Sequence, residues 1–235
     1  MALEYTYLNL YNEDDLETLV FVGNAYAGEP VLKGGKKDGR KDEEKRPCRF
    51  EYLPWLFANA SYGARETFHF DSEFFAQVEL PGGAEPDAPQ RIFGGWRYRV
   101  EEDGSLVHPA GSEGQSRDGS RVEIVNASGT DIDINWMGLN ARNVGRTLNL
   151  KDSACAQFQY SGYMLFLPVK STVKVNPYTP AELDEKGAVP YKPPNNTLKV
   201  EVTFEKRSGD SVQDPTNGSE PGYQYVFSPP SVGLD

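Results

Sequence analysis

Hydrophobic and polar residues alternate along many short segments of this chain, with the period of two that is typical of β-strands. Residues 199–206 are the clearest case. Val200, Val202 and Phe204 fall on one face of the segment, and polar residues fall on the other. The pattern predicts a half-buried strand.

Residues 121–125 and 130–136 show the same alternation on either side of the turn-forming sequence 126–129. We therefore expect a hairpin there. The other expected strands cover residues 3–11, 18–23, 49–53, 67–80 (with a possible bulge), 91–100, 144–150, 154–168, 171–175 and 222–227.

Helical signals are sparse. Residues 179–187 begin with Thr179 as an N-cap, continue with a proline at the first helical position and Glu182 at the capping-box position, and end at Gly187. This predicts two helical turns, and residues 12–18 suggest one more short turn. No segment has the sustained 3.6-residue period of a helical bundle.

The number and spacing of the expected strands favour an all-β fold, an antiparallel two-sheet β-sandwich or jelly roll, with a closed barrel as the alternative. No internal repeat or boundary divides the sequence, so we expect one domain over residues 1–235. Gly, Pro and charged residues predict long loops at residues 33–46, 81–90, 101–120 and 208–222.

Composition narrows the possible partners. The 235 residues carry 35 acidic and 24 basic side chains, a formal charge of -11. Such a chain has no basic footprint for nucleic acid or for an anionic membrane. The segment 33–46 is the exception, because its seven basic and four acidic residues make it locally positive. We interpret it as a solvated loop, or as a contact point for an acidic partner.

Targeting signals are absent from the sequence given. The N-terminal residues lack a basic start and an apolar core, and no apolar stretch is long enough to cross a bilayer. We expect a soluble, cytoplasmic protein, with a secreted mature form as the alternative. Asn-x-Ser/Thr sequons at Asn59, Asn126, Asn195 and Asn217 are interpreted as chance occurrences in turns.

One segment suggests metal chemistry. On a strand, His69, Asp71 and Glu73 share one face, and an imidazole and a carboxylate so placed can reach one metal ion. His108 is the only other histidine available. The alternative is a polar strand face in which His69 is hydrogen-bonded to a neighbouring carboxylate.

A His-x-Asp pair, a distant histidine and a following arginine, here His69, Asp71, His108 and Arg117, resemble the order of these residues in iron/2-oxoglutarate oxygenases. The resemblance covers only these positions. It implies an iron cofactor held by His69, Asp71 and His108, and a co-substrate carboxylate paired with Arg117.

Other catalytic patterns are missing. The sequence has no nucleophile elbow, Walker loop, dinucleotide fingerprint or zinc-protease motif. Cys155 is expected to be a buried core residue, and Cys48 an inert thiol that neighbouring arginines could activate.

Aromatic residues give the remaining signal, because Tyr and Trp side chains at a β-sandwich rim can stack on sugars or anchor a partner. The candidate binding residues are Tyr5, Tyr7, Trp55, Trp96, Tyr160, Tyr163, Tyr223 and Tyr225. For each of them, an ordinary place in the core is the competing interpretation.

We therefore expect a non-catalytic binding protein that recognises a glycan, a lipid headgroup or a protein partner through aromatic-lined loops. One alternative is a self-assembling structural protein, a homo-oligomer joined through edge strands or Tyr-rich faces. The other is a β-scaffold enzyme that uses iron at His69, Asp71 and His108.

Overall fold

The computed structural model describes most of the chain, in ranges separated by gaps. The described ranges are residues 3–10, 16–27, 48–58, 63–70, 73–82, 87–116, 119, 121–138, 142–170, 176–194, 197–206, 223–228 and 231–232. Strands dominate these ranges, which confirms the all-β class. No helix within them is long and apolar enough to cross a membrane.

The chain is organised as two compact units. Unit 1 consists of Met1–Gly23, Pro54–Ser72 and Gly162–Asp235, and unit 2 of Asn24–Leu53 and Glu73–Ser161. A single domain over residues 1–235 stays a prediction. Two of the expected loops, 33–46 and 208–222, lie outside the described residues, and residues 101–120 include a short strand and a 3-10 helix.

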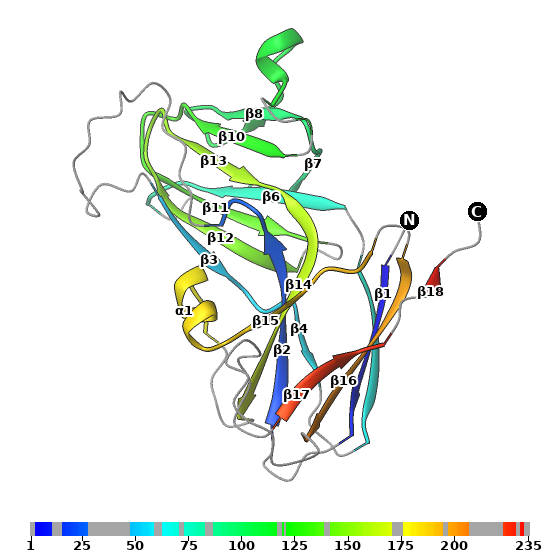
Figure 1. The fold of residues 1–235 in the computed structure, drawn as a ribbon. Coiled ribbons are helices and arrows are strands. Elements are labelled where there is room, and N and C mark those ends of the chain that lie inside the picture. Colours follow the sequence, from blue (N-terminus) through cyan, green and yellow to red (C-terminus); the bar gives the residue numbers. More distant parts are fainter. Residues whose placement is uncertain are drawn as a thin grey trace, which may run out of the picture. The chain divides into compact units, whose positions relative to one another are not determined.

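Unit 1 contains two sheets. The first has the order β17-β16-β1-β5, with β18 also paired to β16, and the second has the order β15-β14-β2-β4 (Figure 1). The bounds are β1 (Leu3–Asn9), β2 (Leu16–Asn24), β4 (Leu56–Ala58), β5 (Arg65–Phe70), β14 (Tyr160–Lys170), β15 (Val189–Tyr191), β16 (Thr197–Lys206), β17 (Tyr223–Phe227) and β18 (Ser231–Val232).

The core of unit 1 follows from the alternation along its strands. Val200, Val202 and Phe204 of β16 are fully buried, as the sequence predicts. Rings from the two sheets contact each other, because Phe166 of β14 lies 6.4 Å from Tyr5 of β1, between ring centroids. Burial of such large rings supplies most of the driving force for packing.

The single α-helix of the described ranges is α1 (Pro180–Glu185), in unit 1. Thr179 accepts a hydrogen bond from the backbone N–H of Glu182, whose carboxylate accepts one from the backbone N–H of Thr179. This reciprocal capping box satisfies two N–H groups that the first turn leaves unpaired. The helix predicted at residues 179–187 is therefore confirmed.

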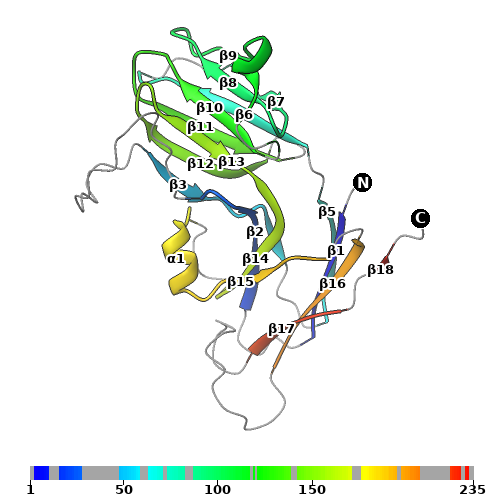
Figure 2. The same ribbon diagram turned by 45° about the horizontal axis from the view of Figure 1, so that its top comes forward.

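Unit 2 also contains two sheets, with the orders β13-β10-β8-β9 and β3-β12-β11-β6-β7 (Figures 1 and 2). The bounds are β3 (Arg49–Tyr52), β6 (Phe74–Glu79), β7 (Gln90–Ile92), β8 (Arg97–Val100), β9 (Leu106–Val107), β10 (Val122–Asn126), β11 (Ile132–Met137), β12 (Asn143–Leu150) and β13 (Cys155–Phe158), with the 3-10 helix η2 (Gly111–Gly114) after β9.

The pairing differs from expectation in two sheets. β1 pairs with β16 and β8 pairs with β10 in parallel, so the expectation of purely antiparallel sheets is wrong at these two places. Parallel neighbours need a long connection between them. Both pairs have one: β16 follows β1 after most of the chain, and β9 and η2 lie between β8 and β10.

The hairpin expected at residues 121–136 is also wrong. Its two strands exist as β10 and β11, but they belong to different sheets of unit 2. Ile124 and Ile134 are both fully buried. The expected strand at 67–80 is similarly divided, because β5 lies in unit 1 and β6 in unit 2. Alternation identifies the buried face of a strand, but it does not identify the strand's partner.

Asn126 holds the turn between β10 and β11. Its Nδ2 donates to the carbonyl oxygens of Thr130 at 2.7 Å and Leu150 at 2.9 Å, and its Oδ1 accepts from the backbone N–H of Ser128 at 3.0 Å. The residue is fully buried. This sequon asparagine therefore serves as a turn residue, as the sequence predicts; the other three sequon asparagines lie outside the described residues.

Replacing Asn126 with alanine is expected to lower the free energy of unfolding by about 3 kcal/mol, because buried carbonyl and N–H groups lose their partner together. Urea unfolding of the variant measures the loss. Asn143→Ala is the matched control, since Asn143 is an exposed asparagine in the same unit and its loss should cost less than about 0.5 kcal/mol. Equal losses would contradict this role for Asn126.

Candidate functional site

The turn between β7 and β8 presents two exposed aromatic rings. Phe93 and Trp96 are each 40% exposed, although both are large apolar side chains. Their ring centroids lie 4.9 Å apart. Gly94 and Gly95 separate them in the sequence, which makes this a tight turn with a ring at each end.

Gly95 fixes the shape of the turn. Its φ is +82°, and a Cβ placed on it would lie 2.8 Å from the carbonyl oxygen of Gly119. Its N–H donates to the carbonyl oxygen of Arg121, and its own carbonyl accepts from the N–H of Ser116, both at 2.8 Å. Only glycine fits this position without strain, so the turn that carries Trp96 is held rigidly.

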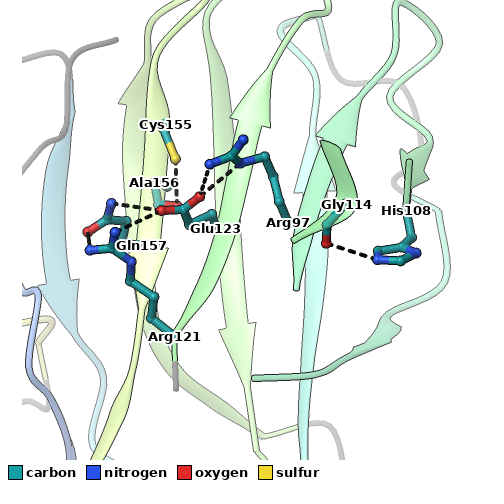
Figure 3. A network of polar contacts seen from close by, with 8 residues as sticks. All are labelled: Arg97, His108, Gly114, Arg121, Glu123, Cys155, Ala156 and Gln157. Atoms are coloured by element: carbon teal, nitrogen blue, oxygen red, sulfur yellow. Dashed lines mark hydrogen bonds and ion pairs between the residues drawn. The ribbon is translucent and has the colours of Figure 1, made fainter. Parts of the chain in front are cut away.

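His108 extends the surface. Its ring stacks on Trp96 with centroids 4.0 Å apart and planes inclined by 27°. Its Nε2 lies 3.0 Å from the carbonyl oxygen of Gly114 (Figure 3). Phe93, Trp96 and His108 together form what we call the aromatic array, and Arg91 places its guanidinium 5.0 Å from the Phe93 ring.

Two features behind the array keep it in place. A Cβ on Gly114 would lie 2.0 Å from the carbonyl oxygen of Pro109, so glycine allows η2 to close against His108. Tyr98 is buried behind the array, and its hydroxyl accepts a hydrogen bond of 3.1 Å from the N–H of Phe93. Burial raises the pKa of Tyr98, so its hydroxyl stays neutral.

A buried ionic network lies on the same sheet. Glu123 of β10 contacts Arg97 of β8, Arg121 and Gln157 of β13 (Figure 3). Arg97 follows Trp96 directly, and consecutive residues of a strand point to opposite faces. The network and the aromatic array are therefore separate features. Cys155 is buried, as expected, and its thiol contacts the carbonyl oxygen of Ala156.

The eight candidate binding residues differ in their exposure to solvent. Trp96 is the exposed one and belongs to the aromatic array. Tyr160 and Tyr163 are half-buried. The other five are buried within unit 1: Tyr5, Tyr7, Trp55, Tyr223 and Tyr225. The four tyrosines are buried because they lie on the inward faces of β1 and β17. Trp55 packs against Phe68 and Phe70.

The candidate iron ligands occupy different settings. His69 is an exposed residue of β5 in unit 1, and His108 belongs to unit 2, where it stacks on Trp96. Asp71 and Arg117 lie outside the described residues. Within the described ranges, no group of three or more His, Cys, Asp or Glu side chains could hold a metal ion. The iron site stays a prediction.

Sequence reasoning missed Phe93 and gave His108 a different role. The available signal was the order of residues, because two glycines between aromatic residues indicate a turn, and turns lie at the protein surface. It also missed the network at Glu123. That network joins residues far apart in the sequence, and alternation alone predicts only that they share a polar face.

No family model, curated protein or solved structure matches this chain.

Proposed function

We propose that the protein is a non-catalytic binding module that recognises a glycan through the aromatic array. The observation that carries this proposal is the pair of rings at Phe93 and Trp96, each 40% exposed and held on a turn that Gly95 fixes. A rigid exposed ring offers a flat apolar face to the C–H face of a sugar and loses little entropy on binding.

Charge and size favour a glycan over the other two ligand classes. A chain with a formal charge of -11 is repelled by an anionic lipid surface. The array contains three rings, whereas a stable protein interface buries on the order of 1,000 Å² or more. Polar side chains adjoin the rings, because the exposed Gln115 forms a β-bridge with Trp96. Such groups can exchange hydrogen bonds with sugar hydroxyls.

We further propose that each unit is a two-sheet β-sandwich. In unit 1, Trp55 beside β4 contacts Phe68 of β5, which belongs to the other sheet. In unit 2, Trp136 of β11 stacks on Phe158 of β13 with centroids 5.1 Å apart, again from different sheets. Such contacts support sheets that pack face to face.

Replacing Trp96 with alanine is expected to weaken glycan binding by about tenfold or more, because a stacked ring contributes on the order of 1.5 kcal/mol. Screening on a glycan array identifies the ligand, and titration calorimetry measures the loss. Phe57→Ala is the matched control, since Phe57 is an aromatic residue of unit 1 that is 44% exposed. This variant should bind like the unchanged protein.

Tryptophan fluorescence provides a second readout. Trp55 and Trp136 are buried, so the solvent-exposed part of the emission comes from Trp96. A bound sugar should shift that emission to shorter wavelength, and Trp96→Phe should remove the shift. The proposal would be contradicted if no glycan bound in the screen, or if Trp96→Ala and Phe57→Ala bound a glycan with equal affinity.

A further inference from the structure

The ionic network of unit 2 forms a row across three strands. Arg97, Glu123 and Gln157 are direct cross-strand neighbours on β8, β10 and β13. Arg121 lies two residues before Glu123 and so shares its face of the sheet. Figure 3 shows Arg97 on one side of the Glu123 carboxylate, and Arg121 with Gln157 on the other.

The contacts of Glu123 are short. Arg97 donates to Oε2 of Glu123 from Nε at 2.8 Å and from Nη2 at 2.6 Å. Nη2 of Arg121 lies 3.1 Å from Oε1 of the same carboxylate. The Glu123 side chain is only 3% exposed, and those of Arg97 and Arg121 are 19% and 15% exposed. Two guanidinium groups thus enclose one carboxylate.

The network carries more positive than negative charge. Among the described residues, Glu123 is the only carboxylate that forms an ion pair with Arg97 or Arg121. Arginine does not lose its proton in proteins, so one positive charge stays unbalanced in a largely buried place. A charge that is desolvated without a partner is costly.

The network also lacks hydrogen-bond acceptors. Nε of Arg121 is buried and has no acceptor within the described ranges. Nη1 of Arg97 makes no hydrogen bond to a described residue, and Figure 3 shows the unbonded end of this guanidinium pointing away from Glu123. Gln157 supplies one further acceptor, at 3.2 Å from Nη1 of Arg121. Because Arg97 and Arg121 lie on opposite sides of Glu123, one small anion cannot contact both; an anion with several oxygens beside the unbonded Nη1 of Arg97 would accept from it and would balance the excess positive charge.

We propose that Arg97 forms a binding site for a tetrahedral oxoanion, a sulfate or phosphate group, in which Arg121 supplies the excess positive charge. The guanidinium fork presents parallel N–H groups that match the oxygens of such an anion. Glu123 orients the two forks and limits the affinity, because its carboxylate repels the anion. The site is distinct from the aromatic array and does not depend on glycan binding.

The test titrates the protein with sodium sulfate at constant ionic strength. Two-dimensional proton–nitrogen spectra follow the arginine Nε–H groups. We expect saturable shifts at Arg97, with smaller shifts at Arg121 transmitted through their shared partner Glu123. Arg121→Gln should weaken binding by about tenfold or more, because the network then carries no excess positive charge. Arg99→Gln is the matched control, since Arg99 lies on β8 with Arg97 and forms an exposed ion pair with Glu101. The sulfate affinity of this variant should stay within about twofold of that of the unchanged protein.

Glu123→Gln gives the opposite expectation. Removing the carboxylate takes away a like charge close to the anion, so sulfate should bind about tenfold more tightly or better. A network that only stabilises the fold would show no such gain. Trp96→Ala should leave sulfate affinity unchanged, which separates this proposal from the glycan proposal.

A comparison of two probes identifies the source of the anion. If glucose 6-sulfate binds at least as tightly as inorganic sulfate, the site accepts a sulfate group carried on a larger ligand. If inorganic sulfate alone binds, the site takes the free ion. Shifts that never saturate, or equal affinities in Arg121→Gln and Arg99→Gln, would overturn the proposal. The wild-type titration decides the matter even if Glu123→Gln does not fold.

Discussion

The free energy of unfolding is expected to fall by at least about 3 kcal/mol for each pH unit above about pH 10, because two tyrosines of unit 1 keep their protons only while the chain is folded. Tyr7 and Tyr225 are buried, and the Thr18 hydroxyl lies between them, 2.8 Å from one hydroxyl and 3.0 Å from the other. The whole group is enclosed between β1, β2 and β17.

The direction of this pH dependence follows from the negative charge of ionised tyrosine. Burial disfavours the phenolate, so it raises the pKa of both Tyr7 and Tyr225, and the mutual repulsion of the two side chains raises that of Tyr225 further. The unfolded chain loses these protons near the ordinary pKa of about 10. Stability is therefore complete below that value and decreases above it, by about 1.4 kcal/mol per pH unit for each tyrosine.

Urea unfolding at successive pH values from about 9 to about 11.5 measures this dependence. Tyr225→Phe should reduce the slope by about 1.4 kcal/mol per pH unit, because one of the two titrating groups is gone. A stability profile that stays flat through this range would show that the tyrosines ionise without unfolding the chain.

Gly145→Ala is expected to cost about 3 kcal/mol of unfolding free energy, because the new methyl group overfills a closed part of unit 2. A Cβ on Gly145 of β12 would lie 2.6 Å from Cζ of Phe50 and 3.1 Å from the carbonyl oxygen of Glu51. Phe50 is only 6% exposed, so its ring has no route into solvent. Glycine inside a strand often marks such a close approach.

Gly119→Ala is the matched control in the same unit, because a Cβ there would meet nothing within 4 Å. Its unfolding free energy should stay within about 0.5 kcal/mol of the unchanged protein. Phe50→Leu combined with Gly145→Ala should recover part of the loss, since the smaller side chain makes room. Equal losses in the two alanine variants would rule out overpacking as the cause.

Local signals in the sequence predict local structure well. The strand at 199–206 and the helix at 179–187 occur as β16 and α1, since alternation and capping act over a few neighbouring residues. Strand partners are a different matter. β10 and β11 looked like a hairpin but joined different sheets, because the hydrogen bonds of Asn126 and the contacts of distant strands decide the pairing.

At the candidate site, too, local sequence does not predict what long-range pairing decides. Trp96 and Tyr5 are both aromatic residues of strand-rich sequence, yet Trp96 is exposed and Tyr5 is fully buried. The difference arises because Trp96 follows a turn at the start of β8, whereas Tyr5 lies within β1, which has a neighbour on each side. The position of a ring relative to its sheet decides its exposure, and that position depends on long-range pairing.

The parallel pairing of β1 with β16 affects the order of events on the ribosome. Every segment of unit 2 has been synthesised by Ser161, whereas unit 1 still lacks β16, the parallel neighbour of β1. Unit 2 can therefore fold while synthesis continues, whereas β1 has β5 available on one edge but lacks β16 on the other until the C-terminal strands emerge. During that interval one edge of β1 keeps its backbone N–H and C=O groups unpaired, so the first sheet of unit 1 is completed last.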